Sequence, residues 1–218
     1  LLGVTAITLR NPRVAFDGVR RIIMCVFLGL FLPVILIALG ESIVVTGATG
    51  GVGSLAIDML TSAGYEAHAI SGKLEHFDRL IALGARQCIS RTDLYWGQRP
   101  LETSRWAGAI DSVGGDMLAG LTRVIHPYGN IASCGNAASI ELATTVMPFI
   151  IRGVSLLGIA SAGTARNIRD AIWQHLASDW RPAHLDRIAT REVGLDGLPA
   201  IFDSLLAGGS FGRTLVKV

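Results

Sequence analysis

The sequence predicts an α/β fold: a doubly wound parallel sheet with helices on both faces, followed by a C-terminal return strand. Three observations support this prediction. Strand-like and helix-like segments alternate from residue 41 onward, which is typical of βαβ crossovers. The strand-like runs are almost continuously apolar, as expected for strands covered on both faces. A glycine-rich turn directly follows the first of these runs.

The individual elements follow from local patterns. The first strand is expected at 42–46, where the β-branched run SIVVT precedes the glycines. Helical periodicity, several times ended by glycine, predicts helices at 52–63, 74–83, 116–125, 165–178 and 198–206. Further strands are expected at 66–70, 86–90, 107–112, 130–134 and 154–159, and a last one lies in the terminal GRTLVKV.

Residues 22–39 form an uncharged apolar run within a distinct N-terminal segment, 1–40. The run reaches the length of a membrane-spanning helix, and the arginines before it suit a cytoplasmic N-terminus. A signal peptide ending near 38–40 and a buried helix are the alternatives. Because a nucleotide-binding pattern begins at Glu41 without a spacer, a membrane anchor is the less favoured interpretation, and the buried helix stays open beside a sequence altered by truncation.

The composition argues against several classes of protein. The chain has 19 basic and 17 acidic residues and is only 6% aromatic, so no nucleic-acid surface is expected. Its three cysteines, Cys25, Cys88 and Cys134, are widely spaced and form no CxxC, which favours reduced thiols and a cytoplasmic location. The histidines show neither an HExxH motif nor zinc-site spacing, so no metal is expected.

The strongest motif is VVTGATGGVGSLA, which lies between a predicted strand and a predicted helix. Gly47 permits a tight turn out of the strand, and Gly50 and Gly51 let the backbone approach a pyrophosphate. Gly53 allows the helix to pack close to the strand. Free N–H groups at the helix start favour phosphate oxygens. We therefore expect a dinucleotide site in a Rossmann domain covering 41–190. The alternative is a glycine-rich turn that binds no ligand.

The end of the second strand indicates which dinucleotide binds. NAD-binding domains place a carboxylate there to accept from the ribose hydroxyls. This chain has Ser71, Gly72 and Lys73 instead, and Lys73 is one of only two lysines. A cation attracts a 2′-phosphate, so NADP(H) is the expected cofactor, although Glu75 weakens the case. The alternative is a solvated turn lysine.

A short-chain dehydrogenase would share the glycine motif but needs a Tyr-x-x-x-Lys pair. Tyr65, Tyr95 and Tyr128 all lack a lysine four residues later, which argues against that class.

A set of motifs follows the glycine turn in order: SGK, WAGAIDSVGG, ASCGNA, TTVMPFIIRGVSLLGI and the terminal GRTLVKV. In this order and spacing the chain resembles the zinc-free quinone-oxidoreductase branch of the medium-chain dehydrogenases/reductases, and within it the acrylyl-CoA reductase group. The resemblance runs from Glu41 to Val218. It implies NADPH-dependent reduction of a C=C bond conjugated to a carbonyl, with an acyl-CoA, enone or quinone as the small-molecule substrate.

The resemblance also implies site residues. Thr49, Gly50, Gly51 and Val52 match the pyrophosphate loop, and Ser71, Gly72 and Lys73 match the 2′-phosphate site. Additional contacts are implied for an arginine after the third strand and for two residues lining the nicotinamide: Arg91, Asn136 and Ile150. No side chain is identified as the proton donor, and Asp111 is interpreted as structural.

The resemblance has consequences for organisation as well. In the family a substrate-side domain precedes the nucleotide domain, so we expect this chain to be the cofactor-binding part, with 191–218 returning to the absent domain. A homodimer through the edge strand at 154–159 is expected. A catalytically silent NADPH-binding module and a membrane-anchored reductase stay open as alternatives.

Overall fold

The computed structural model describes residues 41–218. The predictions for 1–40, including the apolar run at 22–39, lie outside the described residues. Among the helices that are described, none is both long and apolar enough to cross a bilayer.

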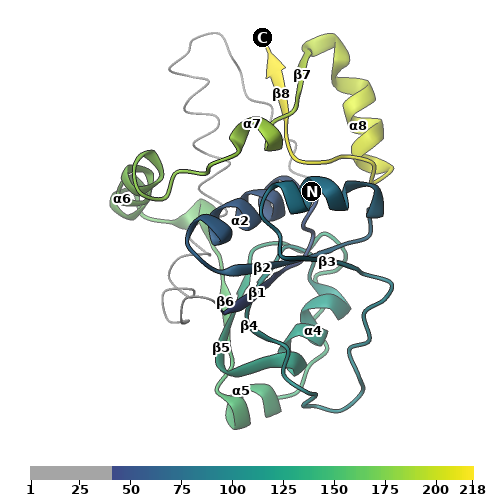
Figure 1. Ribbon diagram of the computed structural model, residues 1–218, viewed down its shortest axis with the longest axis vertical. Coiled ribbons are helices and arrows are strands. Elements are labelled where there is room, and N and C mark those ends of the chain that lie inside the picture. The colour runs from purple at the N-terminus through teal and green to yellow at the C-terminus, as the bar shows by residue number, and fades with distance from the viewer. Residues whose placement is uncertain (1–40) are drawn as a thin grey trace.

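The main body is a six-stranded parallel sheet (Figure 1). Its strands are β1 (Ser42–Val45), β2 (Glu66–Ser71), β3 (Gln87–Ser90), β4 (Trp106–Asp111), β5 (Ile125–Ser133) and β6 (Ser155–Gly158). They are arranged in the order β3-β2-β1-β4-β5-β6, which confirms the doubly wound prediction. The order reverses between β1 and β4, so a crevice is expected where these strands end.

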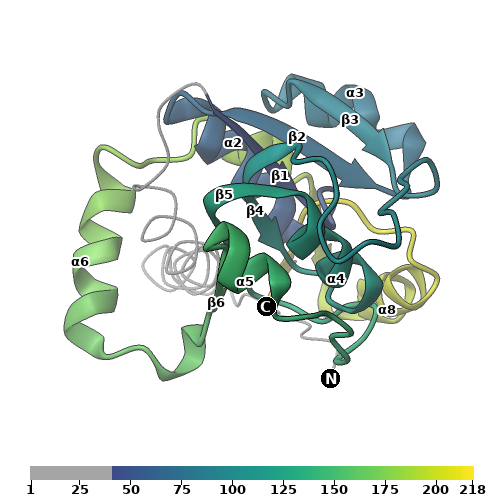
Figure 2. The same cartoon turned by 90° about the horizontal axis from the view of Figure 1, so that it is seen from below.

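Helices cover both faces of this sheet, because alternate residues of each strand face opposite layers. Ile43 and Val45 of β1 pack in one core cluster, with α2 (Gly51–Ser62) and α3 (Phe77–Ala82), and Val44 packs in the other, with α4 (Gly115–Val124). Seen along the sheet, α3 and α4 lie on opposite sides of the strands (Figure 2). All three β1 side chains are completely buried, which explains why the strand reads as a continuous apolar run.

The C-terminal part forms a second, smaller unit. After α6 (Arg166–Ala177) and α7 (Leu185–Ile188), strand β7 (Arg191–Gly194) pairs in parallel with β8 (Thr214–Lys217), and α8 (Leu198–Leu206) connects them. Figure 1 shows this unit at the end of the molecule opposite α5 (Met147–Arg152). The terminal strand and its preceding helix match the prediction.

Three short elements were not predicted: α5, α7 and β7. Each spans only four to six residues, which is too short for a periodic signal. Strand β5 is also longer than expected, since it begins at Ile125 and its pairing with β4 shifts register between Trp106 and Gly108. Tyr128, within this irregular stretch, has a positive φ of 62°, which sequence patterns do not reveal.

Candidate functional site

The turn between β1 and α2 is built on glycines. Gly47 has a φ of +58°, and a Cβ there would lie 2.5 Å from the Ser112 Oγ, so both the backbone conformation and the space require glycine. The Gly50 N–H donates to the Gly47 carbonyl at 2.9 Å and closes the turn. The Ser54 N–H and hydroxyl both donate to the Gly50 carbonyl, which fixes the start of α2.

Gly53 sits where α2 passes closest to this turn. A Cβ at Gly53 would lie 2.5 Å from the Gly47 carbonyl oxygen and 2.6 Å from the Ala48 Cα, both of them backbone atoms. The helix can therefore approach the strand end as closely as it does only without a side chain here. Thr49 is buried, and Val52, in the first turn of α2, packs partly buried against the core. The amides at the start of α2 are held at the carboxyl edge of the sheet.

Asp111, at the end of β4, connects the ends of the neighbouring strands β1 and β4. The Thr46 hydroxyl donates to its Oδ1 at 2.6 Å, and the Gly114 N–H donates to its Oδ2 at 2.9 Å. The side chain is fully buried, and burial raises the pKa of this carboxyl while these hydrogen bonds oppose the rise. Because both carboxyl oxygens accept from neighbouring loops, the geometry supports the structural interpretation of Asp111.

The end of β2 lies beside the glycine turn. The Ser71 and Thr49 hydroxyls are 3.1 Å apart, and the Lys73 N–H donates to the Ser71 Oγ at 3.1 Å. The side chain of Arg91 lies over Gly72, since a Cβ on Gly72 would be 2.6 Å from the Arg91 Nε. The structure thus brings the predicted pyrophosphate loop and the predicted 2′-phosphate residues to one edge.

The Lys73 ammonium donates to the Ser210 carbonyl. Burial lowers the pKa of Lys73, and Glu75 partly opposes this effect, while Arg191 adds to it. The Lys73 ammonium is therefore partly shielded from solvent, which strengthens its attraction to an anion.

A segment that the sequence did not implicate crosses this edge: residues 210–213, which we call the strap. Its Gly212 N–H donates to the Thr49 carbonyl at 2.9 Å, and the Arg213 side chain lies where a Cβ on Gly51 would be. Arg213 is thereby placed at the start of α2, although it is far from that helix in the chain. The only signal in the sequence was a Gly-Arg pair before the last strand, which carries no spatial information by itself.

Asn136 follows β5, on the other side of β4 from the glycine turn. It lies in an exposed loop that packs on the loop after β4, where the Ala138 N–H donates to the Val113 carbonyl at 2.9 Å. The Cα of Asn136 is 3.3 Å from the position of a Cβ on Gly114, so the two loops are in close contact. Asn136 therefore lies at the same carboxyl edge as the glycine turn.

Ile150 does not lie at this edge, and its assignment to the nicotinamide is corrected. It belongs to α5, which immediately precedes β6 and therefore lies at the amino ends of the parallel strands. Figure 1 shows α5 at the far end of the sheet from the C-terminal unit. The side chain is 68% exposed. Asn136 follows β5 whereas Ile150 precedes β6, so the two residues lie at opposite ends of the sheet.

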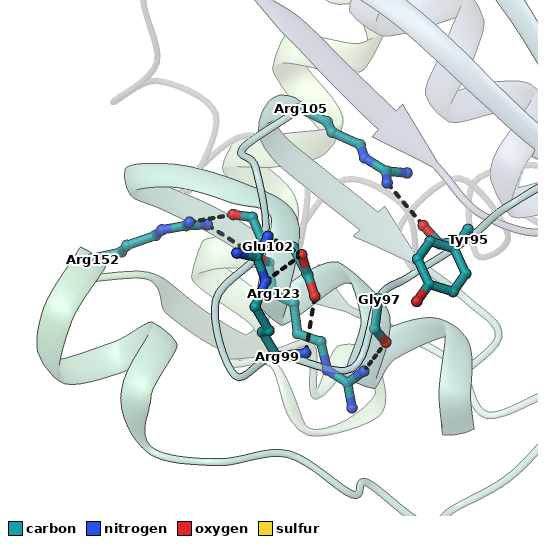
Figure 3. A network of polar contacts seen from close by, with 7 residues as sticks. All are labelled: Tyr95, Gly97, Arg99, Glu102, Arg105, Arg123 and Arg152. Atoms are coloured by element: carbon teal, nitrogen blue, oxygen red, sulfur yellow. Dashed lines mark hydrogen bonds and ion pairs between the residues drawn. The ribbon is translucent and has the colours of Figure 1, made fainter.

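A network of arginines holds this opposite, amino edge together (Figure 3). Arg152 donates to the carbonyls of Glu102, Arg123 and Ile125, the last two at 2.8 and 3.3 Å. Arg99 forms an ion pair with Glu102 at 2.7 Å. Each guanidinium thus anchors a loop, and Arg152 has a structural role here.

The fold and the site define the class of the protein. The strand order, which reverses between β1 and β4, and the glycine turn opening α2 are those of dinucleotide-binding α/β domains. The chain belongs to the zinc-binding dehydrogenase family, whose model matches residues 51–178. Within residues 41–218, no three His, Cys, Asp or Glu side chains gather as metal ligands.

Two curated relatives confirm the resemblance found in the sequence. The Bacillus subtilis protein YhfP, which carries the name of a quinone oxidoreductase, is 43% identical over 81% of this chain and 54% of its own length. The Escherichia coli protein AcuI, named as a probable acrylyl-CoA reductase, is 42% identical over 81% of this chain and 54% of its own. The chain therefore spans about half the length of these relatives.

Solved structures agree with the fold. The Salmonella enterica yhdH oxidoreductase in complex with NADP superposes with a TM-score of 0.85 at 36% identity, over 91% of this chain and 61% of that one. The Bacillus subtilis yhfP structure with NAD bound gives a TM-score of 0.83 at 39% identity, over 89% and 60%.

The packing at Gly53 generates a first prediction. Gly53→Ala forces α2 away from the turn because its Cβ meets backbone, so the free energy of unfolding should fall by about 1–3 kcal/mol. Urea denaturation followed by tryptophan fluorescence measures the loss. Gly163→Ala is the matched control, since nothing lies within 4 Å of a Cβ there. Equal unfolding midpoints for the two variants would contradict the close approach.

The Arg99–Glu102 pair generates a second prediction. Hydrogen bonds from Arg99 lower the pKa of Glu102 from its ordinary 4.5 to about 2. A lowered folded-state pKa stabilises the fold above pH 4.5, and this stabilisation disappears as the pH falls toward 2. Glu102→Gln should therefore be less stable than the parent chain at neutral pH, with a gap that narrows in acid.

Urea midpoints measured at intervals between neutral pH and about pH 3 give this comparison. Glu141→Gln, at an exposed glutamate, is the control and should follow the parent chain throughout. A gap for Glu102→Gln that stays constant with pH would show that the ion pair is not its cause.

Proposed function

We propose that residues 41–218 are the NADP(H)-binding part of a medium-chain oxidoreductase. The observation that carries this proposal is the meeting of two groups at one edge of the sheet. The glycine turn at 47–53 offers backbone amides at a helix start, and Ser71, Lys73 and Arg91 surround the adjacent strand end. The first group suits a pyrophosphate and the second a ribose phosphate.

The pyrophosphate would lie against Thr49, Gly50, Gly51 and Val52, at the positive end of the α2 dipole. No acidic side chain occupies the first turn of α2, so nothing there repels a phosphate. Arg213 of the strap, beside Gly51, would add a guanidinium to the same phosphates.

The preference for NADP(H) over NAD(H) rests on charge at the end of β2. Gly72 lets the Arg91 side chain pass close to the backbone, and Lys73 is next in the chain. These two cations suit a 2′-phosphate, whereas an NAD site would carry a carboxylate. The yhdH structures from Salmonella enterica and Escherichia coli hold NADP and NADPH, and the yhfP structure holds NAD, so relatives of both kinds exist.

For the reaction we propose reduction of a C=C bond conjugated to a carbonyl, with an acyl-CoA or a related enone or quinone as substrate. The names of the relatives, acrylyl-CoA reductase and quinone oxidoreductase, support this class. When bound, NADPH supplies the hydride. Asn136, at the carboxyl edge beyond β4, would lie on the nicotinamide side and orient that ring, while 191–218 would contact the substrate-side domain.

The proposed cofactor site generates a third prediction. Lys73→Gln and Arg91→Gln each remove a charge-assisted hydrogen bond to the 2′-phosphate, so each should weaken NADPH binding roughly tenfold or more. NADH binding should change little. Titration with each nucleotide, followed by nucleotide fluorescence, measures both. Lys217→Gln removes the other lysine, which pairs with Glu192 away from the site, and is the matched control.

A parent chain that binds neither nucleotide would overturn the proposed function. Equal losses for NADPH and NADH would retain a dinucleotide site but remove the assignment of the 2′-phosphate. Turnover of acryloyl-CoA by the chain would also exclude the silent-module alternative.

We also propose that a second copy pairs with the edge strand β6. Sheet order leaves one side of β6 unpaired within the described chain, and its Leu156 and Leu157 are only partly buried. Directly before β6, Ile150 and Ile151 of α5 are 68% and 61% exposed. Apolar side chains beside an open strand edge are a suitable surface for a homodimer.

This interface generates a fourth prediction. Ile151→Arg places a charge in the apolar surface, so the dimer should dissociate to monomers at micromolar concentration. Sedimentation velocity distinguishes the two states. Ile140→Arg, at a side chain 81% exposed in a loop that bridges to Gly114 at the start of α4, should leave the dimer intact. A monomeric parent chain, or a dimeric Ile151→Arg variant, would contradict the proposed interface.

A further inference from the structure

The proposed function does not use an ionisable pair formed by a buried carboxylate, Asp58, and the partly exposed His184. Asp58, on α2, is 1% exposed, and its two carboxyl oxygens both accept from His184. Its Oδ2 accepts from the His184 backbone N–H at 3.0 Å, and its Oδ1 is 2.8 Å from the His184 Nδ1. A buried carboxylate that contacts both the backbone and the ring of one residue fixes that residue firmly.

His184 directly precedes α7, and α7 contacts the strap through its last residue. Ile188, the last residue of α7, is buried in the same core cluster as α2. Its carbonyl accepts from the Arg213 N–H at 2.9 Å, and Gly212 packs against that carbonyl so closely that a Cβ would not fit. The strap is therefore held by α7, through the Ile188 carbonyl, beside the carboxyl edge of the sheet.

The strap in turn contacts both halves of the proposed cofactor site. Gly212 binds the Thr49 carbonyl, and Arg213 lies against Gly51, which are both in the pyrophosphate loop. Ser210 accepts from Lys73, at the 2′-phosphate end. Between them, the Phe211 ring is buried, with the Arg79 guanidinium 4.0 Å from its centroid.

We infer that Asp58 and His184 are a positioning pair, which holds the strap, and with it Arg213, in place for cofactor binding. This inference rests on the proposed function. Neither residue touches the cofactor loop directly; both act through α7 and the Ile188 carbonyl. Holding a phosphate-binding guanidinium in place before binding raises affinity because less freedom is lost when the ligand arrives.

The test is NADPH affinity in a double-mutant cycle with Arg213. His184→Leu should raise the Kd for NADPH about tenfold in the parent chain, but less than about twofold in an Arg213→Ala background. His184→Asn should restore binding, because its amide nitrogen can donate to Asp58 from nearly the position of Nδ1. A role limited to fold stability would give the same loss with and without Arg213.

The chain offers a matched control. His175 pairs with Asp179 at 3.0 Å on an exposed helix end, with its own ring stacked on Trp180. His175→Leu should leave the Kd unchanged. If His184→Leu does not fold, His184→Gln replaces it, since its amide nitrogen lies farther from the backbone and cannot reproduce the Asp58 contact.

The outcomes distinguish the proposed NADPH binding from the positioning role of Asp58 and His184. A parent chain that does not bind NADPH overturns the proposed function itself. A parent chain that binds, with His184 variants that bind equally well or lose affinity equally in both backgrounds, overturns only the positioning pair. Coupling to Arg213 together with rescue by His184→Asn supports it.

Discussion

The site depends on one close approach: α2 lies directly against the turn that ends β1. Gly53 faces backbone atoms of that turn, and Gly47 bends it with a positive φ. With any larger side chain at Gly53, the helix would have to move away from the turn, and its first amides with it. The remaining contacts, from Thr46 to Asp111 and from Ser54 to Gly50, hold this arrangement in register. The start of α2 can bind a phosphate at this edge only if it lies beside the strand ends, and the packing at Gly53 places it there.

Positively charged side chains reach this edge from several distant parts of the chain. Lys73 and Arg91 follow neighbouring strands, and Arg213 arrives on the strap from the C-terminal unit. The strap therefore connects the two units at the place where a ligand would bind. The same few residues therefore contact both the C-terminal unit and the proposed cofactor edge.

The two ends of the sheet have different tasks. At the carboxyl edge, hydroxyls, glycines and cations converge beside the start of α2. At the amino edge, arginines are used to tie loops together, as Arg152 does with three carbonyl oxygens. Arginine-rich sequence is therefore no guide to ligand binding here without the topology, because a guanidinium satisfies loop carbonyls as well as it satisfies anions.

Much of this molecule was decided by local sequence. Continuous apolar strands, glycine stops and the alternation of elements determined the doubly wound sheet, because burial on both faces needs such strands. The glycine turn and Ser71-Gly72-Lys73 could also be located, since residues that follow parallel strands must meet at one edge. Tertiary structure alone decided the rest. The strap reaches the turn across more than half the described chain, and Asp58 meets His184 between distant segments. Local patterns encode which face of an element is buried, but not which remote segment will cover it.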